Sequence, residues 1–228
     1  MSNQQKQDLE KKSAAEKAAE YVKDGMVVGL GSGSTVFFAI KKLGELAKTG
    51  LKFKAVSTSD TTTQIAQSAG LNVVSIDEVN EIDLTIDGAD EIDKDLNGIK
   101  GGGGALLFEK IVALSSKKNI WIVDSSKMVE KLGNFPLPAE VIPFGYKRAL
   151  RKIEDMNLQP VIRKKENDFY YTDSGNYIFD LKTGRIDNLQ KLNDEIKLIT
   201  GVVETGLFID IAQIVIVAKN NGIEILNK

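Results

Sequence analysis

One stretch of this chain, Asp87–Lys110, carries most of the side chains that could do chemistry. It reads DGADEIDKDLNGIKGGGGALLFEK, so it offers carboxylates at Asp87 and Asp90, then Lys100 against four glycines, then Glu109 inside an apolar run. A packed core needs neither such charges nor such bare backbone. A site that moves protons on an anionic substrate needs both, because carboxylates transfer protons while a cation and backbone amides stabilise negative charge.

Each of these features also has an ordinary structural interpretation. DGADE could be a solvated acidic turn, the glycines a linker, and Glu109 an exposed helix position. The acids, however, follow an apolar run that is typical of a strand, and ligands of open α/β sheets bind at the carboxyl ends of strands. Ordering four glycines costs conformational entropy, which is reasonable where backbone must approach a ligand closely. Burial among its apolar neighbours would raise the pKa of Glu109 toward the range useful for a base.

The composition restricts the chemistry further. The 228 residues include no cysteine and no histidine, which excludes a thiolate nucleophile, a disulfide framework and the commonest transition-metal ligands. Proton transfer must therefore fall to Asp, Glu, Lys or Tyr side chains.

Charge and hydropathy exclude several classes of partner. The net charge is −2, from 30 basic and 32 acidic residues, so no global field attracts nucleic acid or a membrane surface. The polar N-terminal segment lacks the apolar region of a secretory signal, and no run approaches the length of a membrane span. We therefore expect a cytoplasmic protein, with neither nucleic acid nor membrane as partner, that holds any anionic ligand in a local site.

A second motif, GLGSGST at 29–35, lies between an apolar run and a helix-like segment. Its glycines allow a sharp turn, the free amides of a helix start attract anions, and Ser34 and Thr35 can cap the helix. The dinucleotide and Walker patterns both fail here. The motif therefore indicates either a small phosphate loop or simply a tight turn. Lys127, which follows the apolar run at 119–123, is either a phosphate partner beside that loop or a surface lysine.

The positioning elements follow from periodicity. Helical spacing at 6–23, 35–46, 61–68 and 105–114 alternates with short apolar runs at 26–31, 53–58, 71–75, 82–86 and 119–123. This alternation predicts an α/β fold with a mostly parallel sheet covered on both faces.

The pattern of alternating apolar runs and helical segments ends near Leu132. Prolines at 136, 138 and 143 predict an extended crossing segment, because proline disfavours helices and central strands. A helix, a meander around a turn at 172–175 and another helix then predict an α+β insert. We expect the apolar runs at 201–208 and 214–218 to rejoin the first sheet.

Five segments carry a family resemblance by their order and spacing: GSGST, DGADE, IKGGGGALLFEK, VDSSKMVEKLGNFPLPAEVIPFG and GVVETGLF. Through them the sequence resembles ribose-5-phosphate isomerase of type A over essentially the whole chain. The resemblance implies a Rossmann-like domain, 1–131 plus 205–228, with a smaller ferredoxin-like domain, 132–204, inserted before the C-terminal strands. It also implies interconversion of D-ribose 5-phosphate and D-ribulose 5-phosphate through an enediolate, in the non-oxidative pentose phosphate pathway. No cofactor and no metal are expected, and the family suggests a homodimer or a dimer of dimers.

The resemblance also implies a role for each candidate residue. Glu109 would be the base, Lys100 would stabilise the enediolate oxygen, Asp87 would move a hydroxyl proton and assist ring opening, and Asp90 would position sugar hydroxyls. The substrate-binding residues would be Ser32, Gly33, Ser34, Thr35, Asp87, Gly88, Ala89, Asp90, Lys100, Gly101, Gly102, Gly103 and Lys127.

Two rival functions stay open at this point. A sugar-phosphate sensor could keep the GSGST loop, but it would have no use for Glu109 together with Lys100 and would normally carry a basic DNA-binding module. An acyl-CoA transferase of the same broad fold would use a glutamate as nucleophile. Isomerase and CoA-exchange assays separate these possibilities.

Overall fold

The computed structural model describes residues 3–219 and 222–228, which form two compact units. The first unit comprises the described residues up to Ala89, Phe108–Lys127 and those from Ile211 onward. The second comprises Asp90–Leu107 and Met128–Asp210, so it includes the glycine run. The domain boundaries expected from the sequence, 1–131 plus 205–228 and 132–204, stay a prediction.

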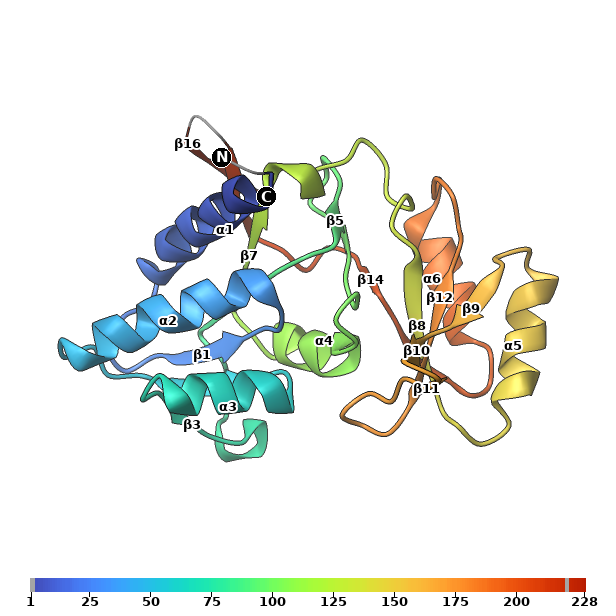
Figure 1. Cartoon of the computed structure of the whole chain (residues 1–228), viewed down its shortest axis with the longest axis horizontal. Coiled ribbons are helices and arrows are strands. Elements are labelled where there is room, and N and C mark those ends of the chain that lie inside the picture. The colour runs from blue at the N-terminus through green and yellow to red at the C-terminus, as the bar shows by residue number, and fades with distance from the viewer. Residues whose placement is uncertain (1–2, 220–221) are drawn as a thin grey trace. The chain divides into compact units, whose positions relative to one another are not determined.

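The first unit is built on a seven-stranded sheet in the order β16-β15-β7-β4-β1-β2-β3. Its strands β1, β3, β7 and β16 are labelled in Figure 1. All its neighbouring strands are parallel except the β15–β16 pair. This confirms the predicted Rossmann-like, mostly parallel sheet. Its strands are β1 (Val27–Leu30), β2 (Lys54–Ser57), β3 (Asn72–Val73), β4 (Leu84–Asp87), β7 (Asn119–Asp124), β15 (Ile214–Lys219) and β16 (Gly222–Asn227).

Helices cover both faces of this sheet. They are α1 (Asn3–Ala19), α2 (Ser34–Lys48), α3 (Asp60–Ser68) and α4 (Leu106–Leu114), with short 3₁₀ turns η1 (Ile76–Glu78) and η2 (Ser125–Lys127). Val28 and Leu30 of β1 belong to the core that the strands form with α1, α2 and α3. Gly29 points the other way, and a Cβ there would lie 2.7 Å from Val112 of α4. Successive strand residues alternate between faces, so α4 covers the opposite face.

The strand order reverses between β1 and β4. From β1 the chain proceeds to β2 and β3 on one side, whereas β4 leads to β7 and β15 on the other. Open α/β sheets bind their ligands at the carboxyl ends of the strands at such a switch point. The residues that follow β1 and β4 are the GSGST loop and DGADE, so the topology brings these two motifs to one edge of the sheet.

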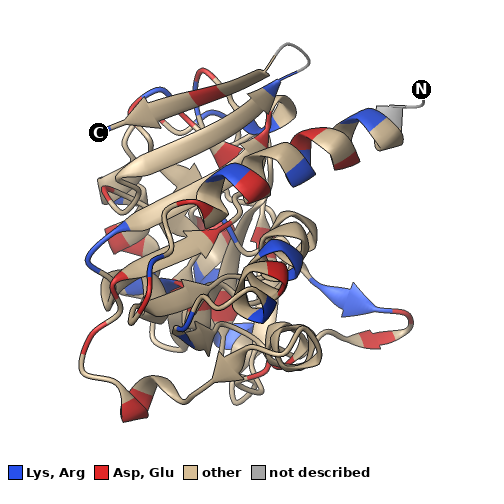
Figure 2. Cartoon of the chain, turned by 90° about the vertical axis from the view of Figure 1, so that its left-hand side faces the viewer, with Lys and Arg blue, Asp and Glu red and all other residues tan. Residues whose placement is uncertain are grey.

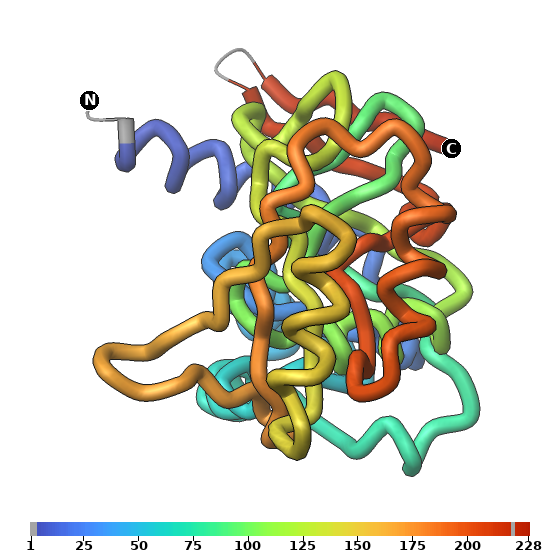
Figure 3. The backbone as a smooth tube through the Cα atoms, turned by 90° about the vertical axis from the view of Figure 1, so that its right-hand side faces the viewer, coloured from blue at the N-terminus to red at the C-terminus, as the bar shows by residue number. Residues whose placement is uncertain are grey.

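The second unit contains a four-stranded antiparallel sheet in the order β13-β8-β12-β9. Along the chain its elements are β8 (Leu137–Val141), α5 (Tyr146–Asp155), β9 (Pro160–Ile162), β12 (Tyr177–Leu181), α6 (Leu189–Lys197) and β13 (Val202–Thr205). This βαββαβ order is the predicted ferredoxin-like arrangement. Between β9 and β12, a hairpin of β10 (Lys164–Lys165) and β11 (Asp168–Phe169) projects from the unit (Figure 3). A smaller sheet joins β5 (Glu91–Ile92), β6 (Gly98–Ile99) and β14 (Leu207–Phe208).

The prediction that the proline-rich segment is only an extended crossing is wrong, because Leu137–Val141 is a fully buried central strand. Pro138 is tolerated for a positional reason. Its carbonyl accepts a hydrogen bond from Gly206, 2.7 Å away, just where the pairing with β13 ends. A residue's N–H and C=O point to the same neighbour in an antiparallel strand, so the missing donor falls beyond the ladder.

The expectation that residues 201–208 rejoin the first sheet is also wrong. β13 pairs with β8, and β14 pairs with β6, both in the second unit. Only the run from Ile214 returns to the parallel sheet, beside β7. Short apolar runs do not specify which sheet they join, since any buried edge offers them the same hydrogen bonds.

Helix α1 carries charges of both signs, which Figure 2 shows as blue and red segments along its ribbon. Within residues 3–219 and 222–228, no helix has the length and apolar character needed to cross a membrane.

Candidate active site

The loop after β1 presents the start of α2 without a side-chain cap. Gly33 is the N-cap residue, at φ 105° and ψ 179°, and no side chain accepts a hydrogen bond from the first turn. The suggestion that Ser34 and Thr35 cap the helix is therefore wrong. Only glycine adopts this backbone conformation readily, which explains Gly33. The uncapped amides of a 15-residue helix remain available to an anion.

Asp87 ends β4 and connects the two motifs of the first unit. Its side chain is 2% exposed, and Oδ1 accepts hydrogen bonds from the N–H groups of Gly88 (2.7 Å) and Ser32 (3.3 Å). A Cβ at Gly31 would lie only 1.8 Å from that oxygen. Glycine is therefore required at 31, because the carboxylate occupies the place of a side chain. The structure thus brings Ser32 and Gly88 together with Asp87, while Ala89 follows half-buried.

The Ser32 hydroxyl lies in a group of hydroxyls that the sequence reasoning missed. It is 2.9 Å from the hydroxyl of Thr58, 2.8 Å from that of Ser59 and 3.2 Å from that of Thr62. These residues follow β2, the strand beside β1, as the run STSDTTT. A row of hydroxyl residues directly after a buried strand was the available signal. These contacts fix the Ser32 side chain of the loop to the segment that follows β2.

Glu109 lies on α4 and is 5% exposed. The alternative of an exposed helix position is therefore wrong, and its expected burial is confirmed. A buried carboxylate is weakly solvated, which is the environment that enzymes use to adjust a general base.

Lys127 closes the η2 turn that follows β7, next to β4 in the sheet. Two buried acids hold this turn. Asp124 accepts hydrogen bonds from the N–H and the hydroxyl of Ser126, and Glu10 of α1 accepts from the N–H (3.4 Å) and hydroxyl (3.3 Å) of Ser125. Glu10, which the sequence reasoning also missed, thus ties the middle of α1 to the turn. On the same helix Lys12 pairs with Glu16 at 3.8 Å.

In the second unit Lys100 is a buried cation. Its side chain is 2% exposed, its Nζ lies 5.2 Å from the ring centroid of Phe208, and its N–H donates to the carbonyl of Gly206 at 2.9 Å. The aromatic face stabilises the ammonium where water is scarce. Phe208 therefore packs against the candidate residue Lys100, although as one apolar residue in the motif GVVETGLF it gave no local signal.

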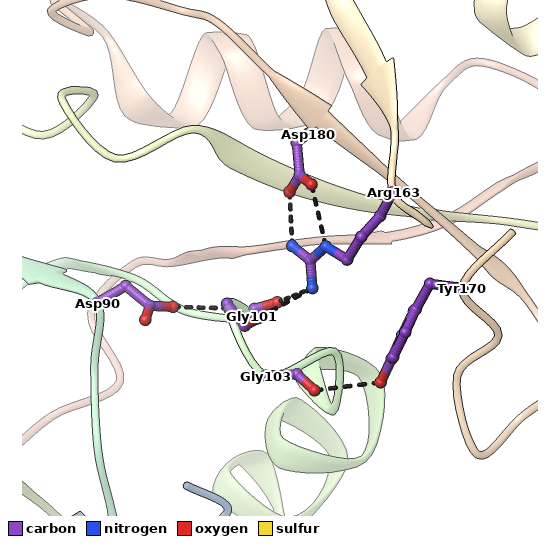
Figure 4. A network of polar contacts seen from close by, with 7 residues as sticks. Asp90, Gly101, Gly103, Arg163, Tyr170 and Asp180 are labelled. Carbon is purple, nitrogen blue, oxygen red and sulfur yellow. Dashed lines mark hydrogen bonds and ion pairs between the residues drawn. The ribbon is translucent and has the colours of Figure 1, made fainter. Parts of the chain in front are cut away.

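Asp90 and the glycine run form the remaining part of the second unit's set. Oδ2 of Asp90 accepts a hydrogen bond from the N–H of Gly102 at 2.7 Å, and a Cβ at Gly102 would lie 2.7 Å from Oδ1. Gly101 and Gly104 have φ of 101° and 84°, which favour glycine. Carbonyls of Gly101, Gly102 and Gly103 accept hydrogen bonds from Arg163 and Tyr170 (Figure 4).

The predicted site residues therefore divide into two sets. The first unit holds Ser32, Gly33, Ser34, Thr35, Asp87, Gly88, Ala89, Glu109 and Lys127, and the second holds Asp90, Lys100, Gly101, Gly102 and Gly103. Across the part of the chain that the structure describes, no three His, Cys, Asp or Glu side chains are grouped as metal ligands would be.

Comparison with known proteins identifies the family. The sequence model of ribose 5-phosphate isomerase A (phosphoriboisomerase A) matches residues 54–222. The chain belongs to this family. Ribose-5-phosphate isomerase A of Listeria monocytogenes serovar 1/2a is 51% identical over 221 residues, which cover 96% of this chain and 99% of that protein. The family member from Levilactobacillus brevis is 50% identical over 223 residues, with coverage of 97% and 98%.

Solved structures of the family agree in fold. Ribose 5-phosphate isomerase from Plasmodium falciparum has a TM-score of 0.94 at 38% identity, covering 97% of this chain and 99% of its own. The enzyme from Methanocaldococcus jannaschii has a TM-score of 0.91 at 38% identity, with coverage of 96% and 98%. A D-ribose-5-phosphate isomerase solved in complex with phospho-erythronic acid has a TM-score of 0.94 at 39% identity, with coverage of 97% and 99%.

Proposed function

We propose that this protein interconverts D-ribose 5-phosphate and D-ribulose 5-phosphate through an enediolate, as a step of the non-oxidative pentose phosphate pathway. Family membership supports the reaction. The observation that carries the chemistry is Glu109, a carboxylate held buried on α4 in a chain without histidine. A sensor would have no use for such a base, and the family match favours isomerisation over acyl transfer from CoA.

The proton moves between adjacent carbons. Glu109 removes the proton from C2 of the open-chain aldose, the C2–H electrons form a C1=C2 double bond, and the C1 carbonyl electrons move to its oxygen. Returning the proton to C1 while the C2 hydroxyl loses its own proton yields the ketose. Asp87 carries the hydroxyl proton from one oxygen to the other and assists ring opening, while Asp90 positions sugar hydroxyls.

Negative charge develops on the enediolate oxygen. Lys100 supplies a cation there, and the glycine run supplies backbone N–H donors. Held in place before the reaction, such groups stabilise the transition state without reorganising. At the other end of the substrate, the uncapped amides of Gly33, Ser34 and Thr35 and the Lys127 ammonium bind the phosphate.

Replacing Glu109 by Gln tests the base. The amide keeps the size of the side chain but cannot accept the C2 proton, so kcat should fall by about 10²–10⁴-fold. Conversion of ribose 5-phosphate is followed with EDTA present, beside a CoA-exchange assay. A wild-type protein that fails to isomerise in EDTA contradicts the metal-free reaction, and a Glu109→Gln variant with near-wild-type kcat contradicts the assignment of the base.

We further propose a cytoplasmic, cofactor-independent enzyme that forms a homodimer or a dimer of dimers. Light scattering of the purified chain measures the mass directly, against 24.9 kDa for one copy. A mass of one copy at micromolar concentration contradicts the oligomer.

A further inference from the structure

The glycine run Gly101–Gly104 is held by two side chains that lie far from it in the sequence, and a third side chain holds one of these two. They are Arg163, directly after β9, Tyr170, directly after β11, and Asp180 of β12, all within the second unit (Figure 4). Consecutive glycines have little conformational preference of their own, so contacts from other elements must select one conformation.

Arg163 fixes two consecutive peptide groups. One terminal nitrogen, Nη1, donates to the carbonyls of Gly101 (2.9 Å) and Gly102 (3.0 Å). The other side of the guanidinium forms a two-point pair with Asp180, from Nε to Oδ2 (3.0 Å) and from Nη2 to Oδ1 (2.5 Å). Both side chains are mostly buried, with 15% and 24% exposed. A planar group held at two points cannot rotate, so Asp180 aims Nη1 at the glycine carbonyls.

Tyr170 fixes the third peptide group. Its hydroxyl donates to the carbonyl of Gly103 at 3.1 Å, and its ring lies 5.8 Å from Cζ of Arg163. Burial raises the pKa of the Tyr170 hydroxyl above its usual range, so the group stays protonated and able to donate at neutral pH.

Fixing the carbonyls also fixes the N–H groups, because N–H and C=O point in opposite directions across a trans peptide. The N–H of Gly102 donates to Asp90, and that of Gly104 donates to the carbonyl of Gly101. The N–H of Gly103 differs, since nothing within 3–219 and 222–228 accepts a hydrogen bond from it. Gly103 is exposed, and the position of a Cβ there has no atom within 4 Å. The described residues therefore leave one exposed N–H donor of the glycine run without an acceptor.

We propose that Arg163, held by Asp180, is a positioning residue that orients the N–H of Gly103, through the Gly102 carbonyl, as a donor to the enediolate oxygen. Tyr170 supports this orientation by fixing the next peptide group along the run. This inference rests on the proposed isomerase function. Loss of either side chain frees the glycine run to adopt other conformations, and the donor then has to be reoriented at the moment of reaction.

The variants Tyr170→Phe and Arg163→Gln test the proposal in steady-state kinetics. Tyr170→Phe removes one hydroxyl and keeps the ring, so kcat should fall about 3–10-fold. Arg163→Gln releases two carbonyls, so kcat should fall about 10–100-fold, within the range for a misplaced catalytic group. KM should change less than about twofold for both, because an interaction made only in the transition state lowers kcat and leaves KM unchanged. Arg163→Lys, which keeps the charge but loses the fork, should resemble Arg163→Gln.

Inhibition separates positioning from a merely structural role. Phospho-erythronic acid, the compound bound in a related structure, carries a carboxylate that imitates the charged oxygens of the enediolate. Its inhibition constant should rise by about the factor by which kcat/KM falls. The inhibition constant of inorganic phosphate, which occupies only the phosphate end, should stay within about twofold.

Lys131→Gln is the matched control, since it breaks an exposed ion pair with Asp187 (2.6 Å) in the same unit. It should alter neither kcat nor inhibition. Folded Arg163 and Tyr170 variants that keep wild-type kcat and wild-type affinity for phospho-erythronic acid overturn the proposal. If Arg163→Gln does not fold, Tyr170→Phe decides alone. An inactive wild type would instead contradict the isomerase function, while an active wild type with an inactive Glu109→Gln shows that function to be sound.

Discussion

Gly31 and Asp87 share a space that accommodates one side chain only. The carboxylate needs that space to receive the N–H groups of Ser32 and Gly88. The pair shows how one buried carboxylate can require a glycine 56 positions away, at the end of a neighbouring strand.

Replacing Gly31 by Ala should therefore displace the Asp87 carboxylate, because the new Cβ would lie 1.8 Å from Oδ1. We expect the free energy of unfolding to fall by about 1–3 kcal/mol, as for an overpacked core, and kcat to fall at least about tenfold. Urea unfolding and steady-state kinetics measure the two effects.

The double variant provides the control for this prediction. In an Asp87→Ala background the space is empty, so adding Gly31→Ala should cost much less stability than it does in the wild type. Equal costs in both backgrounds would show that the clash with Asp87 is not the cause.

Side-chain hydrogen bonds join β1 and β4 at the amino ends of the strands as well as at their carboxyl ends. Oδ2 of Asp83 accepts a hydrogen bond from the N–H of Val27 at 2.9 Å, and Oδ1 pairs with Lys117 at 3.1 Å. These two contacts, the first being the larger, hold the pKa of Asp83 below its usual range. A carboxyl whose pKa is lowered by folding stabilises the protein above its unfolded pKa and loses that effect as pH falls through its folded pKa.

Replacing Asp83 by Asn should lower the free energy of unfolding at pH 7 by about 1 kcal/mol, the usual contribution of one such hydrogen bond. The difference from wild type should shrink as pH falls below about 4, where the wild-type carboxyl also becomes protonated. Urea unfolding at several pH values measures this. The control is Asp187→Asn, whose exposed partner Lys131 should contribute little. A difference that is constant with pH would contradict the role of the Asp83 charge.

Whether the predicted ferredoxin-like domain folds independently depends on residues outside its predicted bounds. Its core includes Ile99 and Leu207, which lie outside the predicted domain 132–204 and are almost completely buried. An isolated 132–204 fragment would leave both side chains out of the core.

We therefore expect that fragment to be unfolded or only marginally stable, because each missing side chain removes about 1.5–3 kcal/mol of burial. Circular dichroism and urea unfolding of the fragment measure this, with the full chain as control. A cooperative transition of the fragment at the midpoint of the full chain would show that 132–204 is an independent domain.

The sequence alone predicted the fold class and, through its resemblance to a known family, the isomerase function. The carboxylates, Lys100 and the glycines can be recognised as candidate site residues from their types and spacing alone. The alternation of apolar runs with helical spacing predicts the parallel sheet. In a parallel sheet the segments that follow β1 and β4 lie at one edge, so the grouping of Ser32 with Asp87 could be predicted from the sequence.

Only the folded structure showed three features. They are the central position of β8, the burial of Lys100 beside Phe208, and the hydrogen bonds of Arg163 and Tyr170 to the glycine run. The contacts of Lys100, Arg163 and Tyr170 join segments about 60 to 110 residues apart. Periodicity reports only on neighbours within a few residues, so an arginine that orients a distant backbone looks like any other arginine in the sequence. The Asp87–Lys110 stretch contains the proposed reacting groups, but its glycines acquire their orientation from side chains that only folding brings to them.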